Sequence, residues 1–421
     1  MTDPVARFLL VPMKLLLLLA ACLVLRTVTG SAPSSAPGSA PSSGPAHGRR
    51  VVGYFTEWNA DFDVDRIRPE LLTHVIYAFA VIKDGQIAID NRQNATDKAY
   101  PGDPPDAPFK GRFRQLQLLK QKHPHLRTLI SVGGWGGSAG FSDAATTEAS
   151  RQRFARSCVD FIDRYGFDGI DIDWEFPVTG GGREGLGKPE DRQNFTLLLG
   201  ELRQQLAGRA ARDGKRRLLT FAAPAGAQNY THIELDQVHA HVDWVNLMTY
   251  DFAGTWSRVS SFNAALYTPD TGVAGFTQHS VDATVHAYRA AGVPAEKIVV
   301  GVPFYGRAFG GVRDVNHGLF QPHDGKPPAT SPGARQWTYG SIIAGGLDKS
   351  ADRHWHDQAK VPWLYDPGTG VLITYEDPDS VRAKAAYVRD QGLGGVMIWE
   401  LSQDDARAAL LEALSTTLLA R

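Results

Sequence analysis

Eight short runs of apolar residues, rich in β-branched and aromatic side chains, recur along the chain. Runs of this length and composition predict buried strands, here at 51–55, 73–80, 128–132, 169–174, 218–223, 242–248, 298–302 and 395–399. Between several of them apolar residues recur at helical spacing, as at Leu198, Leu202 and Leu206. Strands that alternate with helices predict a parallel α/β sheet, and eight such units close into a (β/α)8 barrel, the TIM barrel.

One long stretch interrupts this alternation. Residues 307–378 are rich in turn-forming residues and contain a separate strand-like run at 370–375. Short strands between turns, without a long helical pattern, are typical of an independent small element. We therefore expect residues 307–378 to form a small α+β insertion after the seventh strand.

The N-terminal region has a different composition. Arg7 and Lys14 precede an apolar run at 15–25, a pattern typical of a signal peptide, which we place at 1–30. The following residues, 31–50, are mostly Ser, Ala, Pro and Gly, which bury little apolar surface and predict an extended linker. The catalytic barrel is then expected to occupy residues 51–421 of a secreted protein.

Two alternatives to a cleaved signal peptide remain open. The sequence Leu-Ala-Ala-Cys ending at Cys22 resembles a lipoprotein cleavage box, which would leave the protein lipidated in the cell envelope. The apolar segment 8–25 could also be retained as a membrane anchor, although it is short for a full span. Contact with a membrane is expected only in these two cases.

Composition and charge exclude several classes of function. Lys and Arg total 44 against 45 Asp and Glu, so a net charge of −1 argues against a nucleic-acid partner. The 13 His show no metal-ligand spacing, and no glycine-rich phosphate loop follows a strand, so neither a metal nor a cofactor is expected. Only two cysteines occur, so packing rather than a disulfide framework must stabilise the fold. We expect a monomer.

Acidic side chains alternate with apolar ones in the fourth predicted strand. Asp171, Asp173 and Glu175 therefore share one face, roughly 6.6 Å apart along the strand, while the apolar residues occupy the other. Three carboxylates inside a barrel repel one another, which raises the proton affinity of at least one and suits it to general acid catalysis. A solvated strand face and a cation site are the alternatives. A closed barrel disfavours the first, and a straight strand disfavours the second.

The same segment resembles glycoside hydrolase family 18, the chitinases and their relatives, whose signature on the fourth strand is D-x-x-D-x-D-x-E. Asp168, Asp171, Asp173 and Glu175 fill its four positions. Segments 131–135, 248–252, 301–307 and 394–400 are similar to the motifs of the third, sixth, seventh and eighth strands of that family. The resemblance covers about residues 51–410.

The resemblance implies roles for the acidic residues. It implies cleavage of β-1,4 bonds after N-acetylglucosamine with retention, in which the acetamido group of the substrate is the nucleophile. Glu175 would be the general acid and base, and Asp173 would orient the acetamido group. Asp171 would hold Asp173 and share a proton with it. Tyr250 would donate to the acetamido carbonyl, whereas Asp168, on the opposite face, would be structural.

The resemblance also implies a set of substrate-binding residues. Trp399 would form the floor beneath the sugar at the cleavage point, since an aromatic face suits the apolar side of a pyranose. The other residues expected to contact chitin or chito-oligosaccharides are Met248, Asp251, Trp135, Tyr305, Arg307, Trp58, Trp256, Trp363, Tyr54 and Phe79. Two other functions remain as alternatives. One is an endo-β-N-acetylglucosaminidase acting on glycoprotein glycans, and the other is a non-hydrolytic chitin-binding lectin, which the intact Glu175 argues against.

Overall fold

A computed structural model describes residues 48–182, 187–326 and 337–419. The expected signal peptide, the linker up to residue 47 and the lipoprotein alternative at Cys22 lie outside the described residues. In the described part of the chain, no helix is both long and apolar enough to cross a membrane.

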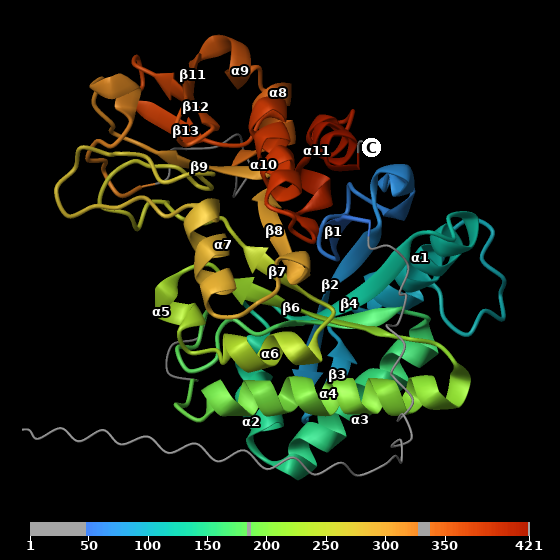
Figure 1. Ribbon diagram of the computed structural model, residues 1–421. Coiled ribbons are helices and arrows are strands. Elements are labelled where there is room, and N and C mark those ends of the chain that lie inside the picture. The colour runs from blue at the N-terminus through green and yellow to red at the C-terminus, as the bar shows by residue number, and fades with distance from the viewer. Residues whose placement is uncertain (1–47, 183–186, 327–336, 420–421) are drawn as a thin grey trace, which may run out of the picture. The chain divides into compact units, whose positions relative to one another are not determined.

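Eight parallel strands close into a barrel, which confirms the predicted fold class (Figure 1). In chain order the strands are β1 (Arg50–Thr56), β2 (His74–Lys83), β4 (Arg127–Gly133), β5 (Gly169–Asp173), β6 (Leu218–Pro224), β7 (Trp244–Met248), β8 (Ile298–Pro303) and β14 (Gly395–Trp399). Each strand pairs with its sequence neighbour in the barrel, and β1 closes the ring by pairing with both β2 and β14. A ninth strand, β3 (Gln86–Ile89), runs antiparallel to β2 at its end.

Helices cover the outside of the barrel (Figure 1). They are α1 (Gly111–Lys122), α2 (Phe141–Thr146), α3 (Glu148–Tyr165), α4 (Asp191–Asp213), α5 (Ala227–Tyr230), α6 (Leu235–His241), α7 (Val281–Ala290), α10 (Pro378–Asp390) and α11 (Ala409–Leu419). Local signals set their limits. For example, Thr147 and Ser150 form a capping box at the start of α3, and Gly166, at a φ of +72°, ends it.

The insertion follows the seventh barrel strand, as predicted. It is a five-stranded antiparallel sheet made of β9 (Tyr305–Phe309), β10 (Trp337–Thr338), β11 (Asp352–His356), β12 (Val361–Asp366) and β13 (Val371–Thr374). Two short helices, α8 (Tyr339–Ala344) and α9 (Leu347–Ser350), accompany the sheet. The sheet already begins at Tyr305, slightly before the predicted limit, and the barrel resumes with α10.

Three apolar clusters stabilise these layers. The largest lies between the strands and the surrounding helices and includes Ile170, Ile172 and Leu198. A second fills the inside of the barrel, and a third forms the core of the insertion. The third cluster also contains Phe262, which belongs to the long loop after β7. The insertion and that loop therefore pack together beside the barrel.

Candidate active site

The alternation of acidic and apolar residues on β5 places the acids inside the barrel. Ile170 and Ile172 are buried in the outer layer, whereas the Asp171 carboxylate accepts hydrogen bonds from side chains of four other strands. The donors to its Oδ2 are Tyr54 Oη and Ser131 Oγ, both at 2.7 Å, and the donors to its Oδ1 are Thr220 Oγ1 at 2.6 Å and Asn246 Nδ2 at 3.3 Å. Burial raises the pKa of Asp171, and these hydrogen bonds partly offset that rise.

The expected proton shared between Asp171 and Asp173 stays a prediction. The hydrogen bonds that Asp171 accepts among the described residues come from four other side chains. Its influence on Asp173 is electrostatic, since its negative charge helps to raise the pKa of Asp173.

Asp173 and Glu175 follow at the carboxyl end of the strand, where barrel enzymes place their reactive groups. Burial, and then repulsion from Glu175, raises the pKa of Asp173 well above its usual value. Burial and the charge of Asp251 raise the pKa of Glu175 to about 8. A carboxyl group with such a pKa keeps its proton at neutral pH and can donate it. Asp173 Oδ1 is buried and has no hydrogen-bond partner among the described residues, so it is available to a donor on a ligand.

Two glycines of the third-strand motif allow β4 to approach these acids. Gly133 has a φ of +109°, and a Cβ atom there would lie 2.2 Å from the carbonyl oxygen of Asp173. Gly134 has a φ of +80°, and its Cβ would lie 2.6 Å from the ring of Phe79. Its N–H donates to the Asp173 carbonyl at 2.9 Å. A side chain at position 133 would push β4 away from β5, and one at position 134 would displace the ring of Phe79 on β2.

A groove with a volume of about 1340 Å³ opens above Asp173 and Glu175. It brings together most of the residues predicted from the sequence. Its lining includes Tyr54, Trp58, Phe79, Trp135, Asp173, Glu175, Met248, Tyr250, Asp251, Trp256, Tyr305, Arg307 and Trp399. Of the predicted site residues, only Asp171, which is buried below the acids, and Trp363 do not line it.

Aromatic rings form part of the groove wall. The ring of Trp399 lies 5.3 Å from that of Tyr54 and stacks on that of Phe79 at 5.8 Å, measured between centroids. Trp58 stacks on Phe79 at 6.1 Å. Trp58 and Trp135 are 57% and 60% exposed, which is unusual for tryptophan and leaves much of each ring accessible to a ligand. These rings supply a broad apolar surface next to the acids.

An ion pair between Asp251 and Arg307 forms another part of the groove wall. Asp251 Oδ1 accepts hydrogen bonds from the Tyr305 hydroxyl at 2.6 Å and from Arg307 Nε at 2.9 Å. The Arg307 guanidinium also lies over the ring of Trp256 at 5.1 Å, so it orients a tryptophan that is 62% exposed. Asn263 connects this wall to the insertion, because its side chain accepts from the Asp251 N–H and donates to the Tyr305 carbonyl.

Tyr250 also lines the groove. Burial, and then the negative charge of Asp173, raises the pKa of its hydroxyl well above the usual value, so it remains a proton donor. The hydroxyl contacts the sulfur of Met397 at 3.8 Å. Sulfur is a weak acceptor, so a ligand carbonyl can replace it at little cost.

The expectation for Trp363 is not met. Its ring is only 6% exposed and packs within the core of the insertion between Phe262 and His354. Its indole N–H donates to the His317 carbonyl at 3.1 Å. The side chain therefore stabilises the insertion and offers no face to the groove.

Comparison with known proteins agrees with this geometry. The family model described as glycosyl hydrolases family 18 matches residues 50–404. The chain belongs to family 18 of the glycosyl hydrolases. The predicted family, and with it the predicted enzyme class of glycoside hydrolase, is confirmed.

Relatives of this family-18 chain include several chitinases. Chitinase A1 of Niallia circulans is 40% identical over 394 residues, which cover 84% of this chain and 56% of that protein. Chitinase 1 of Aphanocladium album is 35% identical over 359 residues, covering 83% of this chain and 80% of the relative. The solved structure of chitinase ChiA74 from Bacillus thuringiensis matches with a TM-score of 0.84 and 36% identity over 88% of this chain and 70% of that one. The chain thus spans little more than half the length of Chitinase A1.

The first acid of the family-18 signature lies away from the groove. Asp168 precedes β5, and its Oδ2 accepts from the Thr128 N–H and from Lys120 Nζ, both at 2.8 Å. These contacts join the start of β5 to β4 and to α1. The placement agrees with the structural role expected for Asp168.

Sequence reasoning missed several residues that line the groove. They include Glu57, Asp90, Phe176, Gln228, Asn229, Phe276 and His279. Glu57 could have been found, because it follows the first predicted strand at its carboxyl end. Burial and the charge of Asp90 raise the pKa of Glu57 to about 7. Phe276 and His279 lie in the long loop after β7, where no local pattern pointed to a ligand.

Proposed function

We propose that this chain is a chitinase that hydrolyses β-1,4 bonds between N-acetylglucosamine units with retention. The observation that carries the proposal is Glu175, a carboxyl group with a pKa of about 8 in the lining of an open, aromatic-lined groove. Its family membership and the chitinases among its relatives support the same substrate class.

In the first step the acetamido oxygen of the substrate attacks the anomeric carbon while the bond to the leaving oxygen breaks. Glu175 gives its proton to that leaving oxygen. Asp173 accepts the acetamido N–H on its unpartnered Oδ1 and so holds the acetamido carbonyl in position. Tyr250 donates its hydroxyl to the same carbonyl, in place of its contact with Met397.

In the second step water attacks the anomeric carbon of the oxazolinium intermediate and restores the sugar with retained configuration. The Glu175 carboxylate accepts the proton of that water and returns to its acid form. The Asp173 carboxyl group, still bonded to the acetamido N–H, and the negative charge of Asp171 stabilise the positive intermediate. The four donors around Asp171 support this role, because they favour its ionised form inside the barrel.

The groove also supports a polymeric substrate. Trp58, Trp135 and Trp256 are exposed along a groove larger than one sugar needs, so several sugar rings can stack at once. A linear polymer fits this arrangement better than a branched glycan.

The test compares hydrolysis of colloidal chitin with release of glycans from a high-mannose glycoprotein. We expect the wild-type chain to cleave chitin, Glu175→Gln to bind oligosaccharides without cleaving them, and Asp173→Asn to be nearly as impaired. Oligosaccharides that lack the N-acetyl group at the cleavage point should resist hydrolysis. Release of glycans without action on chitin would identify an endo-β-N-acetylglucosaminidase instead. Binding without any hydrolysis by the wild-type chain would identify a lectin.

We also propose that the protein is exported. The pattern of Arg7, Lys14 and the apolar run at 15–25 supports a cleaved signal peptide. Sequencing the N-terminus of the mature protein from the culture medium tests this. A lipid-modified Cys22 in the envelope fraction, or an uncleaved chain in the membrane, would identify one of the two alternatives.

A further inference from the structure

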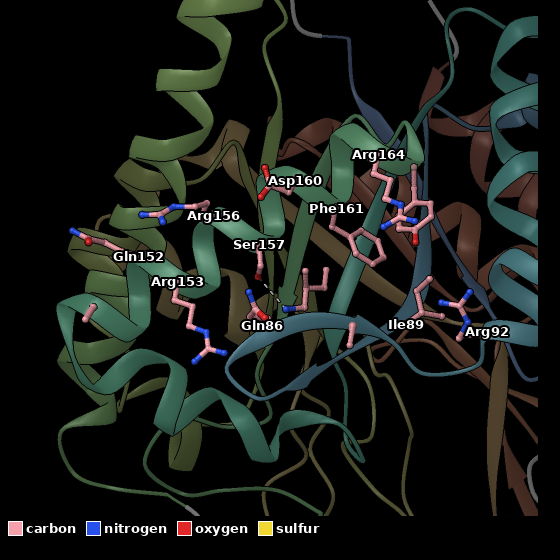
Figure 2. A pocket seen from close by; sticks show the side chains of 14 residues that line it. Gln86, Ile89, Arg92, Gln152, Arg153, Arg156, Ser157, Asp160, Phe161 and Arg164 are labelled. Atoms are coloured by element: carbon pink, nitrogen blue, oxygen red, sulfur yellow. Dashed lines mark hydrogen bonds between the residues drawn. The ribbon is translucent and has the colours of Figure 1, made fainter. Parts of the chain in front are cut away.

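A second groove lies on the flank of the barrel, apart from the one that holds Glu175. It has a volume of about 630 Å³ and lies between the strand β3 and the helix α3 (Figure 2). None of its lining residues lines the active-site groove. The Ile87 N–H donates to Ser157 Oγ at 3.1 Å, so a hydrogen bond joins its two walls.

Most of the charged side chains that line this groove are arginines. Arg153, Arg156 and Arg164 come from α3, and Arg92 approaches from beyond β3 (Figure 2). Positions 153, 156 and 164 fall near one face of the helix and span roughly 16 Å at 1.5 Å per residue. The charges are thus distributed along the groove, which suits a chain-like ligand with repeated anionic groups.

These arginines keep most of their binding capacity. Among the described residues, Arg153 and Arg156 form no ion pair, and Arg164 lies over the ring of Tyr165 at 5.3 Å. Arg92 has an exposed contact of 3.4 Å to Asp97. Asp160 is the only acidic residue that lines the groove, so four guanidinium groups face one carboxylate. This local excess of positive charge contrasts with a net charge of −1 for the whole chain.

The side chains between the arginines indicate what kind of anion fits. Gln86, Gln152 and Ser157 offer amide and hydroxyl groups, which can hydrogen-bond to sugar hydroxyls. Ile87 and Ile89 add a short apolar strip. Guanidinium groups bind carboxylates with two parallel hydrogen bonds. Polar amides, an apolar strip and guanidinium groups together match sugar rings that carry carboxylates.

We propose that this groove binds an acidic polysaccharide, a polymer whose sugar rings carry carboxylate groups. Such binding holds the enzyme on a matrix that contains an acidic polymer, while the active-site groove stays free for its substrate. The hairpin of β2 and β3 contributes to both sites, because Asp90, directly after β3, lines the active-site groove.

The test measures binding of the full-length chain to polygalacturonate at neutral pH and low salt. Arg153→Glu with Arg156→Glu reverses two of the four guanidinium charges and should weaken binding by about tenfold or more. The matched control is Arg192→Glu with Arg212→Glu, two exposed arginines of α4 outside the groove, which should leave binding unchanged. Cleavage of a soluble chito-oligosaccharide should be equal in all three proteins, which shows that the fold is intact.

Two further probes distinguish recognition of an acidic sugar chain from binding by charge alone. Fully methyl-esterified polygalacturonate has the same sugar chain without carboxylates and should not bind. Inorganic polyphosphate has the charge without sugar rings and should bind more weakly than polygalacturonate. Absence of polygalacturonate binding, an equal loss in the control variant, or tighter binding of polyphosphate would each overturn the proposal.

Discussion

Glu175→Gln should lower the activity of the protein and, at alkaline pH, raise its stability. The substitution keeps the shape of the side chain and removes its proton, so turnover should fall on the order of 10³-fold. The same change removes a carboxyl group whose ionisation is unfavourable in the folded protein. Burial and the charge of Asp251 raise the pKa of that carboxyl from 4.5 to about 8.

The size of the stability effect follows from these two pKa values. Below about pH 4.5 the group is protonated in both the folded and the unfolded chain, so its ionisation has no effect on stability. As pH rises from about 4.5 to about 8, the unfolded chain releases the proton while the folded chain keeps it, and stability is lost. The pKa values differ by about 3.5, at 1.36 kcal/mol for each pH unit, so the loss above pH 8 approaches about 5 kcal/mol.

Glutamine at position 175 has no such loss. Urea unfolding of the wild type and the variant should therefore give similar free energies at pH 5, within about 1 kcal/mol. At pH 8.5 the variant should be more stable by several kcal/mol, with about 5 kcal/mol as the upper bound. Asp173 adds to the effect in the same direction, because removing the neighbouring charge lowers the cost of its own ionisation.

Glu70→Gln provides a control of the opposite sign. Partial burial acts to raise the pKa of Glu70, but the hydrogen bond from Arg68 acts in the opposite direction. The pKa of Glu70 is therefore below its usual value. The ionised form of Glu70 therefore adds stability above its unfolded pKa, and that stability is lost as pH falls. The control variant should gain nothing between pH 5 and pH 8.5. If Glu175→Gln shows the same difference from wild type at both pH values, Glu175 does not hold its proton in the folded protein.

Three other outcomes are expected. The value of kcat/KM should fall on the alkaline side with an apparent pKa near 8, because Glu175 must carry its proton; constant activity up to pH 10 would contradict that role. Trp135→Ala should reduce cleavage of the polymer with little change in the unfolding midpoint, because Trp135 is exposed. Trp363→Ala removes a buried side chain and should destabilise the protein by about 3–5 kcal/mol. Equal stabilities of the two variants would refute the positions assigned to these residues. Tyr54→Phe should cost about 2 kcal/mol at neutral pH in a urea titration, because it removes a buried donor to Asp171; unchanged stability would show that this hydrogen bond contributes little.

Much of the fold could be predicted because its signals are local. A strand alternates its faces every residue, so the order of acids and isoleucines on β5 already determined which side chains point into the barrel. Eight apolar runs with helical patterns between them determined the parallel barrel, since crossovers of this kind close in one way. The family motifs at the strand ends then placed Glu175, Asp173, Tyr250 and Trp399 around one opening.

Contacts between distant segments could not be predicted in this way. Trp135 lies between glycines and Trp363 lies in an apolar run, and neither pattern shows whether the ring meets a ligand. One ring is exposed in the groove and the other is buried against His354. Asn263 connects Asp251 to the insertion, although nothing near position 263 indicates a role in the site.

The sequence by itself thus determined the barrel, the face of β5 that carries the acids and the position of Glu175 in the signature, because each is encoded in local patterns of residues. The raised pKa of Glu175 depends instead on burial and on the distant Asp251. The tertiary structure alone decided which tryptophans meet a ligand and how Asp171 is held. Closing the barrel brings Tyr54, Ser131, Thr220 and Asn246 from four strands onto that one buried carboxylate. Asp171 is buried, and has these four donors, only in the closed barrel.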